Sequence, residues 1–210
     1  DLELMRAIYK NLGSLDNLQT KDVIHFLKQH PEFCKINAHI KQKIPNHANK
    51  EKVKISVIIR THNSANFIRN AIDSALNQTL SEEFYEILVV DDGSTDGTVE
   101  LLKSYGEKIR IIKGDGLGPV KAANIGIEKA RGEYVILLDA DDEFEPDALE
   151  EMLSFIEASD ADFVYCDYYE KNIENGKVKL ISLKDNIFNS VAVGVLFKKS
   201  ILRDVGGYNE

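Results

Sequence analysis

At 210 residues the chain is long enough to bury a substantial core, and its length favours one main domain with a small appendage. A hydrophobic content of 43% and a charged content of 29% are those of an ordinary globular protein, not of a disordered or fibrous one. The net charge of −9 argues against a nucleic-acid partner, because nucleic-acid phosphates would be repelled. An acidic protein that binds a phosphate-rich ligand needs a cation in its site.

The two cysteines, Cys34 and Cys166, are far apart in the sequence. This spacing suggests neither a disulfide framework nor a cysteine metal site, and it predicts packing residues in a reducing compartment. No apolar run is long enough to span a bilayer. We therefore expect a cytoplasmic protein, with peripheral contact at the inner face of the membrane as the alternative.

Residues 1–50 are predicted to form a small helical N-terminal segment with a linker. Apolar residues recur at helical spacing between residues 2 and 12, and again between residues 23 and 27. Residues 45–50 are polar and rich in turn-forming residues, which is typical of a linker. The lysines around them fit either an anionic membrane surface or a solvated charged segment. This segment suggests no chemistry.

From residue 53 the pattern becomes strand, loop, helix, repeated. We expect strands at 55–59, 86–90, 109–112 and 134–138, and helices at 67–76, 99–105 and 122–130. Strands that alternate with helices predict an α/β fold with a parallel sheet built from right-handed crossovers. All the polar loops that leave these strands then lie along one edge of the sheet.

The last third of the chain predicts a helix after Pro146, a strand at 161–166, a strand at 191–197 and a short helix at 198–204. Asn175 and Gly176 lie between two partly β-forming stretches, which indicates an antiparallel hairpin at an edge of the sheet.

The expected strand 134–138 is followed by four residues that carry three carboxylates, Asp139-Ala140-Asp141-Asp142. If the strand continues briefly, Asp139 and Asp141 point to the same side, since side-chain direction repeats every two residues. Two hard oxygen ligands suit Mg²⁺ or Mn²⁺ held jointly with a substrate diphosphate. The alternative is an acidic loop that caps the next helix.

Four segments, in order, resemble family 2 glycosyltransferases, and the resemblance covers residues 53–210. They are residues 56–63 (SVIIRTHN), 89–98 (VVDDGSTDGT), 130–142 (ARGEYVILLDADD) and 206–210 (GGYNE). The resemblance implies a GT-A fold, a Rossmann-like three-layer sandwich with a mostly parallel central sheet. It also implies a nucleotide-diphosphate sugar donor, with a UDP-sugar favoured, and a divalent cation, Mn²⁺ or Mg²⁺, at a DXD motif. Transfer would proceed with inversion to a hydroxyl acceptor, a glycan or lipid-linked glycan, as in polysaccharide biosynthesis.

The resemblance also suggests residue roles around the nucleotide. Thr61 and Asn63 match the loop that contacts the nucleotide, although Asn63 fits equally a cap of the following helix. Asp92 matches the carboxylate that accepts a hydrogen bond from the base. Asp91 and Asp96 are expected to be structural, serving the turn and the next helix.

Further roles concern the diphosphate. Asp139 resembles the residue near the ribose and the metal, Asp141 resembles the direct metal ligand, and Ala140 between them belongs to the same donor site. Lys121 and Asn124, on the helix after the glycine-rich loop, are candidates for phosphate or sugar contacts, with a solvated lysine as the alternative.

Two donor-site residues depart from the family pattern. Arg60 stands where the family usually has proline, and His62 where it usually has tyrosine. Arg60 either adds a positive charge near the diphosphate or pairs with a neighbouring acid.

An inverting transferase also needs a general base to deprotonate the acceptor. In the family that base follows the segment matched by residues 206–210, so we expect it beyond Glu210 and name no catalytic residue. We expect these 210 residues alone to bind donor but to transfer sugar poorly or not at all.

The sequence disfavours two other enzyme classes. Gly114-x-Gly116-x-Gly118 lacks the Rossmann spacing of a dinucleotide oxidoreductase. A sugar-nucleotide pyrophosphorylase would carry a glycine-rich loop after its first strand, where residues 60–63 are RTHN. A non-catalytic nucleotide-sugar-binding or assembly module stays open as the alternative function.

Overall fold

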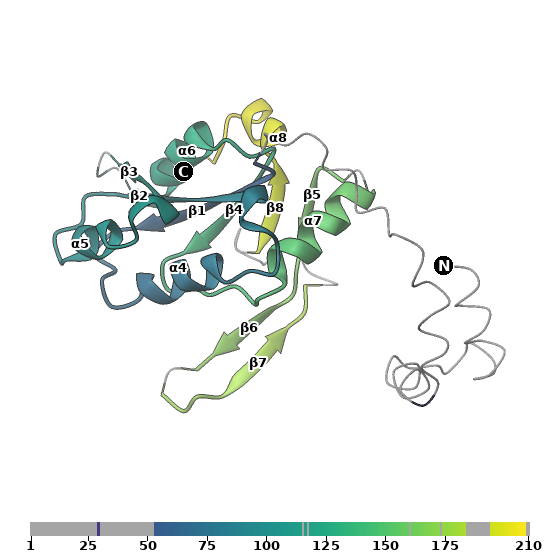
Figure 1. The fold of residues 1–210 in the computed structure, drawn as a ribbon, viewed down its shortest axis with the longest axis horizontal. Helices are drawn as coiled ribbons and strands as arrows, with labels where there is room; N and C mark the ends of the chain where they lie inside the picture. The colour runs from purple at the N-terminus through teal and green to yellow at the C-terminus, as the bar shows by residue number, and fades with distance from the viewer. Residues whose placement is uncertain are drawn as a thin grey trace. The chain divides into compact units, whose positions relative to one another are not determined.

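A computed structural model gives the fold and describes Gln29 and residues 53–114, 116, 118–159, 161–172, 174–183 and 194–208 (Figure 1). The chain divides into two units, residues 1–50 and 51–210. The helices and linker expected in the first unit, and Cys34, lie outside the described residues. The described residues from 53 onward all belong to the second unit.

The described part of this unit is built on a six-stranded sheet with the order β3-β2-β1-β4-β8-β5. The strands are β1 (Ile55–Thr61), β2 (Tyr85–Asp91), β3 (Arg110–Lys113), β4 (Tyr134–Asp139), β5 (Phe163–Tyr165) and β8 (Val195–Lys198). The first four run parallel, while β8 is antiparallel to both β4 and β5. The expected mostly parallel sheet is confirmed.

Helices cover both faces of the sheet, which confirms the three-layer sandwich (Figure 1). One face carries α4 (Ile68–Leu76), α5 (Thr98–Lys103) and α7 (Ala148–Ser159). The other carries α6 (Pro119–Lys129) and α8 (Lys199–Asp204). Short 3₁₀ turns, η2 (Glu82–Phe84) and η3 (Gly106–Lys108), lead into β2 and β3.

The alternation of side chains along the strands divides the core in two. In β1, Val57 and Ile59 pack into the cluster under α4 and α7, whereas Ile58 packs into the cluster under α6 and α8. Both faces of β1, β2 and β4 are therefore buried, as the continuous apolar runs predict for parallel strands covered on two sides. The first core cluster is the larger, and Leu149 and Ile156 of α7 lie within it.

The hairpin predicted around Gly176 is present, but it forms a sheet of its own instead of an edge of the main sheet. Its strands are β6 (Tyr168–Lys171) and β7 (Val178–Ile181), which pair only with each other among the described strands. Gly176 adopts a φ of +67°, and the side chain of Asn172 accepts the backbone N–H groups of Glu174 and Asn175. The hairpin turn predicted at Asn175 and Gly176 is therefore confirmed.

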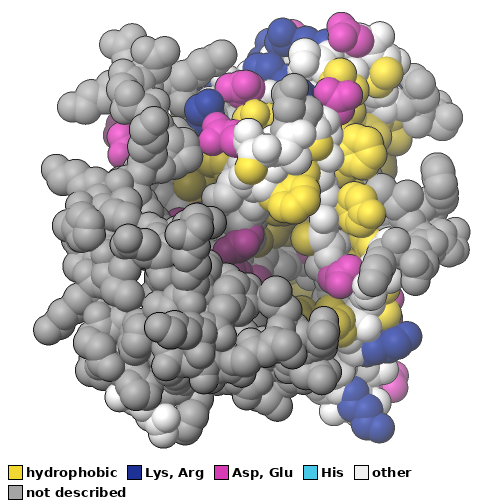
Figure 2. Space-filling view, turned by 90° about the vertical axis from the view of Figure 1, so that its right-hand side faces the viewer, with side chains coloured by type: hydrophobic (Ala, Val, Ile, Leu, Met, Phe, Trp, Pro, Cys, Tyr) yellow, Lys and Arg dark blue, Asp and Glu magenta, His cyan; other side chains and the backbone are white. Residues whose placement is uncertain are grey.

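The β5 edge of the main sheet exposes large apolar side chains. Phe163 and Tyr165 of β5 are 42% and 41% exposed, and Phe155 of the neighbouring helix α7 is 65% exposed. Figure 2 looks onto this side of the molecule and shows hydrophobic side chains gathered among acidic ones. In the part of the chain that the structure describes, no helix combines the length and the apolar character needed to cross a membrane.

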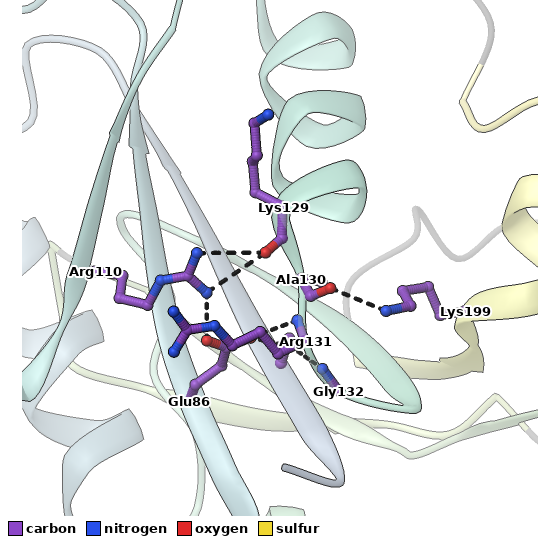
Figure 3. Close-up of polar contacts among 8 residues, drawn as sticks. Glu86, Arg110, Lys129, Ala130, Arg131, Gly132 and Lys199 are labelled. Carbon is purple, nitrogen blue, oxygen red and sulfur yellow. Dashed lines mark hydrogen bonds and ion pairs between the residues drawn. The ribbon is translucent and has the colours of Figure 1, made fainter. Parts of the chain in front are cut away.

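At the amino-terminal ends of the parallel strands, the Glu86 carboxylate joins three elements (Figure 3). It accepts hydrogen bonds from Ser56 Oγ at 2.7 Å and from the backbone N–H of Arg131 at 2.6 Å, and it forms an ion pair with Arg110. Gly132 N–H in turn donates to Ser56 Oγ at 2.9 Å. This network fixes how the loop before β4 enters the sheet, so the opposite ends of the strands meet in register.

Candidate functional site

The predicted residues on β1, β2 and β4 lie together where these strands end, at the carboxyl-terminal ends of the parallel strands (the carboxyl edge of the sheet). Thr61 is aligned with Asp91 of β2, and Arg60 is aligned with Asp139 of β4. Asp92 follows directly and donates its backbone N–H to the carbonyl oxygen of Thr61 at 2.8 Å. Ligands bind at this edge in open α/β sheets, because the loops that leave the strands form a crevice there.

Arg60 and Asp139 form an ion pair at the centre of this edge. Alternation along β1 places Arg60 on the same side of the sheet as Ile58, toward α6 and α8. One guanidinium nitrogen, Nη2, donates to Asp139 Oδ1, while the buried Nε–H has no hydrogen-bond partner. Of the two sequence interpretations of Arg60, pairing with a neighbouring acid is thus observed.

The residues after β4 make an acidic turn. The backbone N–H of Asp142 donates to the carbonyl oxygen of Asp139 at 3.1 Å, Ala140 is buried, and Asp141 is exposed. Burial raises the pKa of Asp142, and the negative charges of Asp141 and Asp139 raise it further. The turn therefore carries a negative potential that a bound cation would relieve.

A metal ion at this turn would take its protein ligands from the turn itself. In the described residues there is no cluster of three or more histidine, cysteine, aspartate or glutamate side chains that could hold a metal. Hard cations accept carboxylate oxygens, and Mg²⁺ in particular keeps water and phosphate oxygens as further ligands. The oxygens of Asp139 and Asp141 fit such an ion when a phosphate ligand completes its coordination.

The loop after β1 is tied to the loop after β2 by Asn63. Its φ of +54° lies in the left-handed region, its N–H donates to Ser94 Oγ at 2.8 Å, and its Oδ1 accepts the N–H of Thr95 at 2.8 Å. Asn63 is not the cap of the next helix, because α4 begins at Ile68 without a side-chain cap. The amide joins two loops instead of capping one helix.

His62 completes the same link. Its Nδ1 lies 2.8 Å from the carbonyl oxygen of Asp92, and its Nε2 lies 3.0 Å from Asn63 Nδ2. A carbonyl only accepts and an amide nitrogen only donates, so Nδ1 carries the proton and Nε2 is the acceptor. The neutral Nδ1–H tautomer is the form that satisfies both contacts.

Asp91 and Asp96 are structural, as the sequence predicted. Asp91 Oδ1 accepts the N–H of Ser94 at 3.2 Å. Asp96 accepts the hydroxyl and the N–H of Thr98 at the start of α5, and the N–H of Ala65 at 3.1 Å. The hydrogen bond from the Thr98 hydroxyl, followed by the one from Ala65, lowers the pKa of Asp96.

Asp92 holds the glycine-rich loop. Its Oδ1 accepts the N–H of Gly116 and its Oδ2 accepts the N–H of Gly118, both at 2.8 Å. A Cβ at Gly114 would lie 2.6 Å from Asp92 Oδ1, so only glycine fits there. Because each carboxylate oxygen has two lone pairs, the role predicted for Asp92 toward a base is compatible with these bonds and stays a prediction.

The two candidates on α6 differ in position. Lys121 is exposed near the start of the helix. Asn124 uses both ends of its amide on Tyr208: Nδ2 donates to the carbonyl oxygen and Oδ1 accepts the N–H, both at 2.9 Å. Asn124 thus positions a neighbouring segment with one donor and one acceptor of its amide, and the sugar or phosphate contact suggested for it stays a prediction.

Tyr208 is the site residue that sequence reasoning missed. It packs against the core cluster under α6, and its buried hydroxyl has no hydrogen-bond partner. The signal was present, because Tyr208 lies in the last segment that resembles the family, after Gly206 and Gly207. Its burial depends on contact with α6, where its partner Asn124 lies 84 positions earlier, so it cannot be read from local sequence. Asn209 and Glu210 lie outside the described residues.

Comparisons with known proteins agree with this geometry. The profile of Glycosyl transferase family 2 matches residues 56–206. An uncharacterized glycosyltransferase of Rickettsia felis is 40% identical over 126 residues, which are 59% of this chain and 20% of that protein. The chain thus spans about a fifth of the length of this relative.

Solved structures share the fold. The structure of S. aureus TarS 1-349 in complex with UDP-GlcNAc matches with a TM-score of 0.62 and 25% identity, covering 72% of this chain and 47% of that one. A mannosyltransferase from Pyrobaculum calidifontis, solved with GDP-Man and Mn²⁺, matches with a TM-score of 0.59 and 21% identity over 75% of this chain and 48% of that one. With a matched profile over more than two thirds of its residues, the chain belongs to glycosyl transferase family 2.

Proposed function

We propose that the unit formed by residues 51–210 binds a nucleotide-diphosphate sugar at the carboxyl edge of its sheet and takes part in transferring the sugar to a hydroxyl acceptor. The observation that carries the proposal is the meeting of Arg60, Asp139 and the acidic turn at the ends of adjacent parallel strands. A diphosphate needs positive charge, and this edge offers Arg60 directly and a cation through the turn.

The proposed donor is a UDP-sugar. Support comes from TarS, which binds UDP-GlcNAc and is related at 25% identity. Hydrogen bonds of Asn63, His62 and Asp92 join the loops that would present donors and acceptors to a nucleotide. Asp92 is our candidate for the acceptor that meets an N–H of the base.

The proposed metal ligands are Asp141 and Asp139, with Mn²⁺ or Mg²⁺ as the ion. When bound, the ion would neutralise negative charge that develops on the departing nucleoside diphosphate. Asp139 Oδ1 accepts a hydrogen bond from Arg60 Nη2, which would keep the guanidinium beside the same diphosphate. The three carboxylates of this turn, Asp139, Asp141 and Asp142, place negative charge where the cation would sit.

Transfer with inversion requires that the acceptor oxygen attack the anomeric carbon from the side opposite the diphosphate while a base takes its proton. The residues described above bind and orient the donor, and we assign none of them as that base. The proposed acceptor is a hydroxyl of a glycan or of a lipid-linked glycan.

Calorimetric titration with UDP, GDP and dTDP tests the proposal, each with Mn²⁺ and with chelator. UDP is expected to bind in the presence of Mn²⁺, and Asp141→Asn is expected to weaken that binding by about tenfold or more, since it removes a charged ligand. Glu107→Gln is the matched control, because Glu107 is an exposed acid that precedes β3 at the opposite edge of the sheet. Folded protein that binds none of the three nucleotides would contradict the proposal.

A further inference from the structure

Three buried side-chain polar atoms in the described part of the chain have no hydrogen-bond partner, and all three belong to the candidate site. They are Arg60 Nε, Thr61 Oγ1 and the hydroxyl of Tyr208. A buried donor without an acceptor costs free energy, so buried polar groups nearly always have a partner. Orphaned donors that gather at one edge of a sheet indicate a ligand that supplies acceptors.

Two of these atoms, from Arg60 and Tyr208, lie on the same side of the sheet. Arg60 follows Ile58 by two residues on β1, and Tyr208 packs against the cluster that contains Ile58. Burial raises the pKa of Tyr208, and the positive charge of Arg60 partly opposes this rise. The guanidinium is thus within electrostatic reach of the phenol.

The phenol is held firmly in this place. The Asn124 side-chain amide forms hydrogen bonds with both the N–H and the carbonyl oxygen of Tyr208. The preceding residue, Gly207, has a φ of +82°, and a Cβ there would lie 2.5 Å from Asn124 Oδ1. A side chain at position 207 would therefore push the Tyr208 segment away from α6.

The chemistry of the pair selects an anion. Arg60 Nε–H can only donate a hydrogen bond, and a phenol donates readily to a charged oxygen. Asp139 already takes one arm of the guanidinium and leaves the Nε–H unused. A group with several negatively charged oxygens would satisfy both donors at once, as a diphosphate does.

We propose that Arg60 and Tyr208 bind the diphosphate of the donor directly, so that it keeps measurable affinity for the protein without a divalent cation. This inference rests on the proposed function, because it concerns the same donor. It goes beyond that function by assigning the unpartnered Arg60 Nε–H and Tyr208 hydroxyl as direct donors to the diphosphate, which act without the cation at the acidic turn.

The test is calorimetric titration of the metal-free protein, in EDTA, with inorganic pyrophosphate and with UDP. Tyr208→Phe removes the hydroxyl and keeps the ring that packs against the core. Arg60→Gln removes the charge, and Arg60→Lys keeps the charge but loses the Nε donor. The controls are Tyr105→Phe, whose hydroxyl binds Asp73 on α4, and Arg131→Gln, an exposed arginine at the opposite edge of the sheet.

Wild-type protein is expected to bind pyrophosphate in EDTA. Tyr208→Phe and Arg60→Gln should each weaken this binding by about tenfold or more, because hydrogen bonds to charged groups are strong. Both controls should stay within about twofold of the wild type. Urea unfolding tests whether each variant is folded. If Arg60→Gln does not fold, the affinities of Tyr208→Phe and Arg60→Lys for pyrophosphate decide whether the two residues bind the diphosphate.

Two results overturn the inference: no pyrophosphate binding by wild-type protein in EDTA, or wild-type affinity in both Tyr208→Phe and Arg60→Lys. A parallel titration of UDP with Mn²⁺ separates this from failure of the proposed function. If UDP binds with Mn²⁺ while pyrophosphate fails in EDTA, only the direct role of Arg60 and Tyr208 is lost. If UDP binds in neither condition, the donor site itself is lost and the inference with it.

Discussion

The side-chain amide of Asn124 holds the backbone of Tyr208 by two hydrogen bonds of 2.9 Å, across 84 positions of sequence. An amide presents one donor group and one acceptor, which match the carbonyl oxygen and the N–H of a single residue. Through this pairing the middle of α6 fixes the segment that follows α8. The sequence suggested a ligand contact for Asn124, and the structure shows a contact that positions another site residue.

Asn124→Asp should therefore destabilise the fold more than Asn124→Ala. The carboxylate still accepts the N–H of Tyr208, but its second oxygen faces a carbonyl oxygen, so two acceptors repel. We expect a loss of about 1 kcal/mol for Asn124→Ala in the free energy of unfolding, and a larger loss for Asn124→Asp. Urea unfolding measures both.

Asn70→Ala is the matched control for this pair, because the exposed Asn70 amide donates an exposed hydrogen bond to Glu143. It should change the free energy of unfolding by less than about 0.5 kcal/mol. Equal stability of Asn124→Asp and Asn124→Ala would show that the carbonyl of Tyr208 does not matter.

Much of the fold could be predicted because local patterns decide it. The continuous apolar runs of β1, β2 and β4 alternate with segments whose apolar residues recur at helical spacing. This pattern predicts a parallel sheet covered by helices on both faces. The acidic turn after β4 was also visible, since its carboxylates follow a buried strand directly. The hairpin was recognised from Asn175 and Gly176, but its place outside the main sheet depends on pairing that no turn residue specifies.

The less predictable parts of the site depend on contacts between distant segments. Asn63 fitted a nucleotide contact and a helix cap equally well in the sequence, and in the structure it bonds Thr95, more than 30 residues away. Asp92 looked free to meet a ligand, yet the backbone of the glycine-rich loop folds onto its carboxylate. Side chains of the same type satisfy either arrangement, so only the fold decides between them.

Glu86→Gln should destabilise the protein strongly. Its carboxylate accepts from Ser56, from the backbone of Arg131 and from Arg110, and only 10% of its side chain is exposed. An amide would place a donor against one of these donors and leave Arg110 without its counter-charge. We expect a loss of about 3 kcal/mol in the free energy of unfolding, measured in urea.

The exposed pair between Glu128 and Lys129 provides the comparison. Glu128→Gln should change stability by less than about 1 kcal/mol, as for other surface ion pairs. A loss for Glu86→Gln no greater than that for Glu128→Gln would mean that the network in Figure 3 contributes little to the fold.

Gly132→Ala should be among the most damaging single methyl additions in the chain. A Cβ at Gly132 would lie 2.6 Å from the backbone nitrogen of Ser56 and 2.8 Å from the carbonyl oxygen of Tyr134. Backbone atoms inside a sheet cannot move aside as a flexible side chain does. We expect a loss of about 3 kcal/mol in the free energy of unfolding.

Gly106→Ala separates this clash from backbone strain. Gly106 has a φ of +58°, but nothing lies within 4 Å of an added Cβ. Only the left-handed conformation then opposes alanine, at a cost of about 1 kcal/mol. The thermal midpoints of the two variants should differ clearly, and similar midpoints would contradict the steric argument.

Asp96 should make the protein less stable in acid. Hydrogen bonds from Thr98 and Ala65 lower its pKa in the folded state, so its contribution to stability is fully present above the unfolded pKa of about 4. It is lost as the pH falls below that value, through the folded pKa. Asp96→Asn should therefore be less stable than wild type at pH 7, and the difference should shrink at pH 3. A constant difference between Asp96→Asn and wild type over this pH range would argue against titration of this group.

Asn63 combines a strained backbone with a side-chain link, and two substitutions can separate these effects. Asn63→Gly keeps the φ of +54° without strain but loses the amide that accepts the N–H of Thr95. Asn63→Ala loses the amide and also places a β-carbon in the left-handed region. We expect Asn63→Ala to be less stable than Asn63→Gly by about 1 kcal/mol in urea unfolding.

The same two variants connect the loop to donor binding. If the link from Asn63 to Thr95 matters only for stability, Asn63→Gly should bind UDP in the presence of Mn²⁺ as well as the wild type does. If the link presents the nucleotide site, both variants should bind UDP more weakly and by similar factors, because both lose the amide. We expect the second result, since the amide joins the two loops that carry His62 and Asp92. Wild-type affinity in Asn63→Gly would remove Asn63 from the donor site and leave it a structural residue.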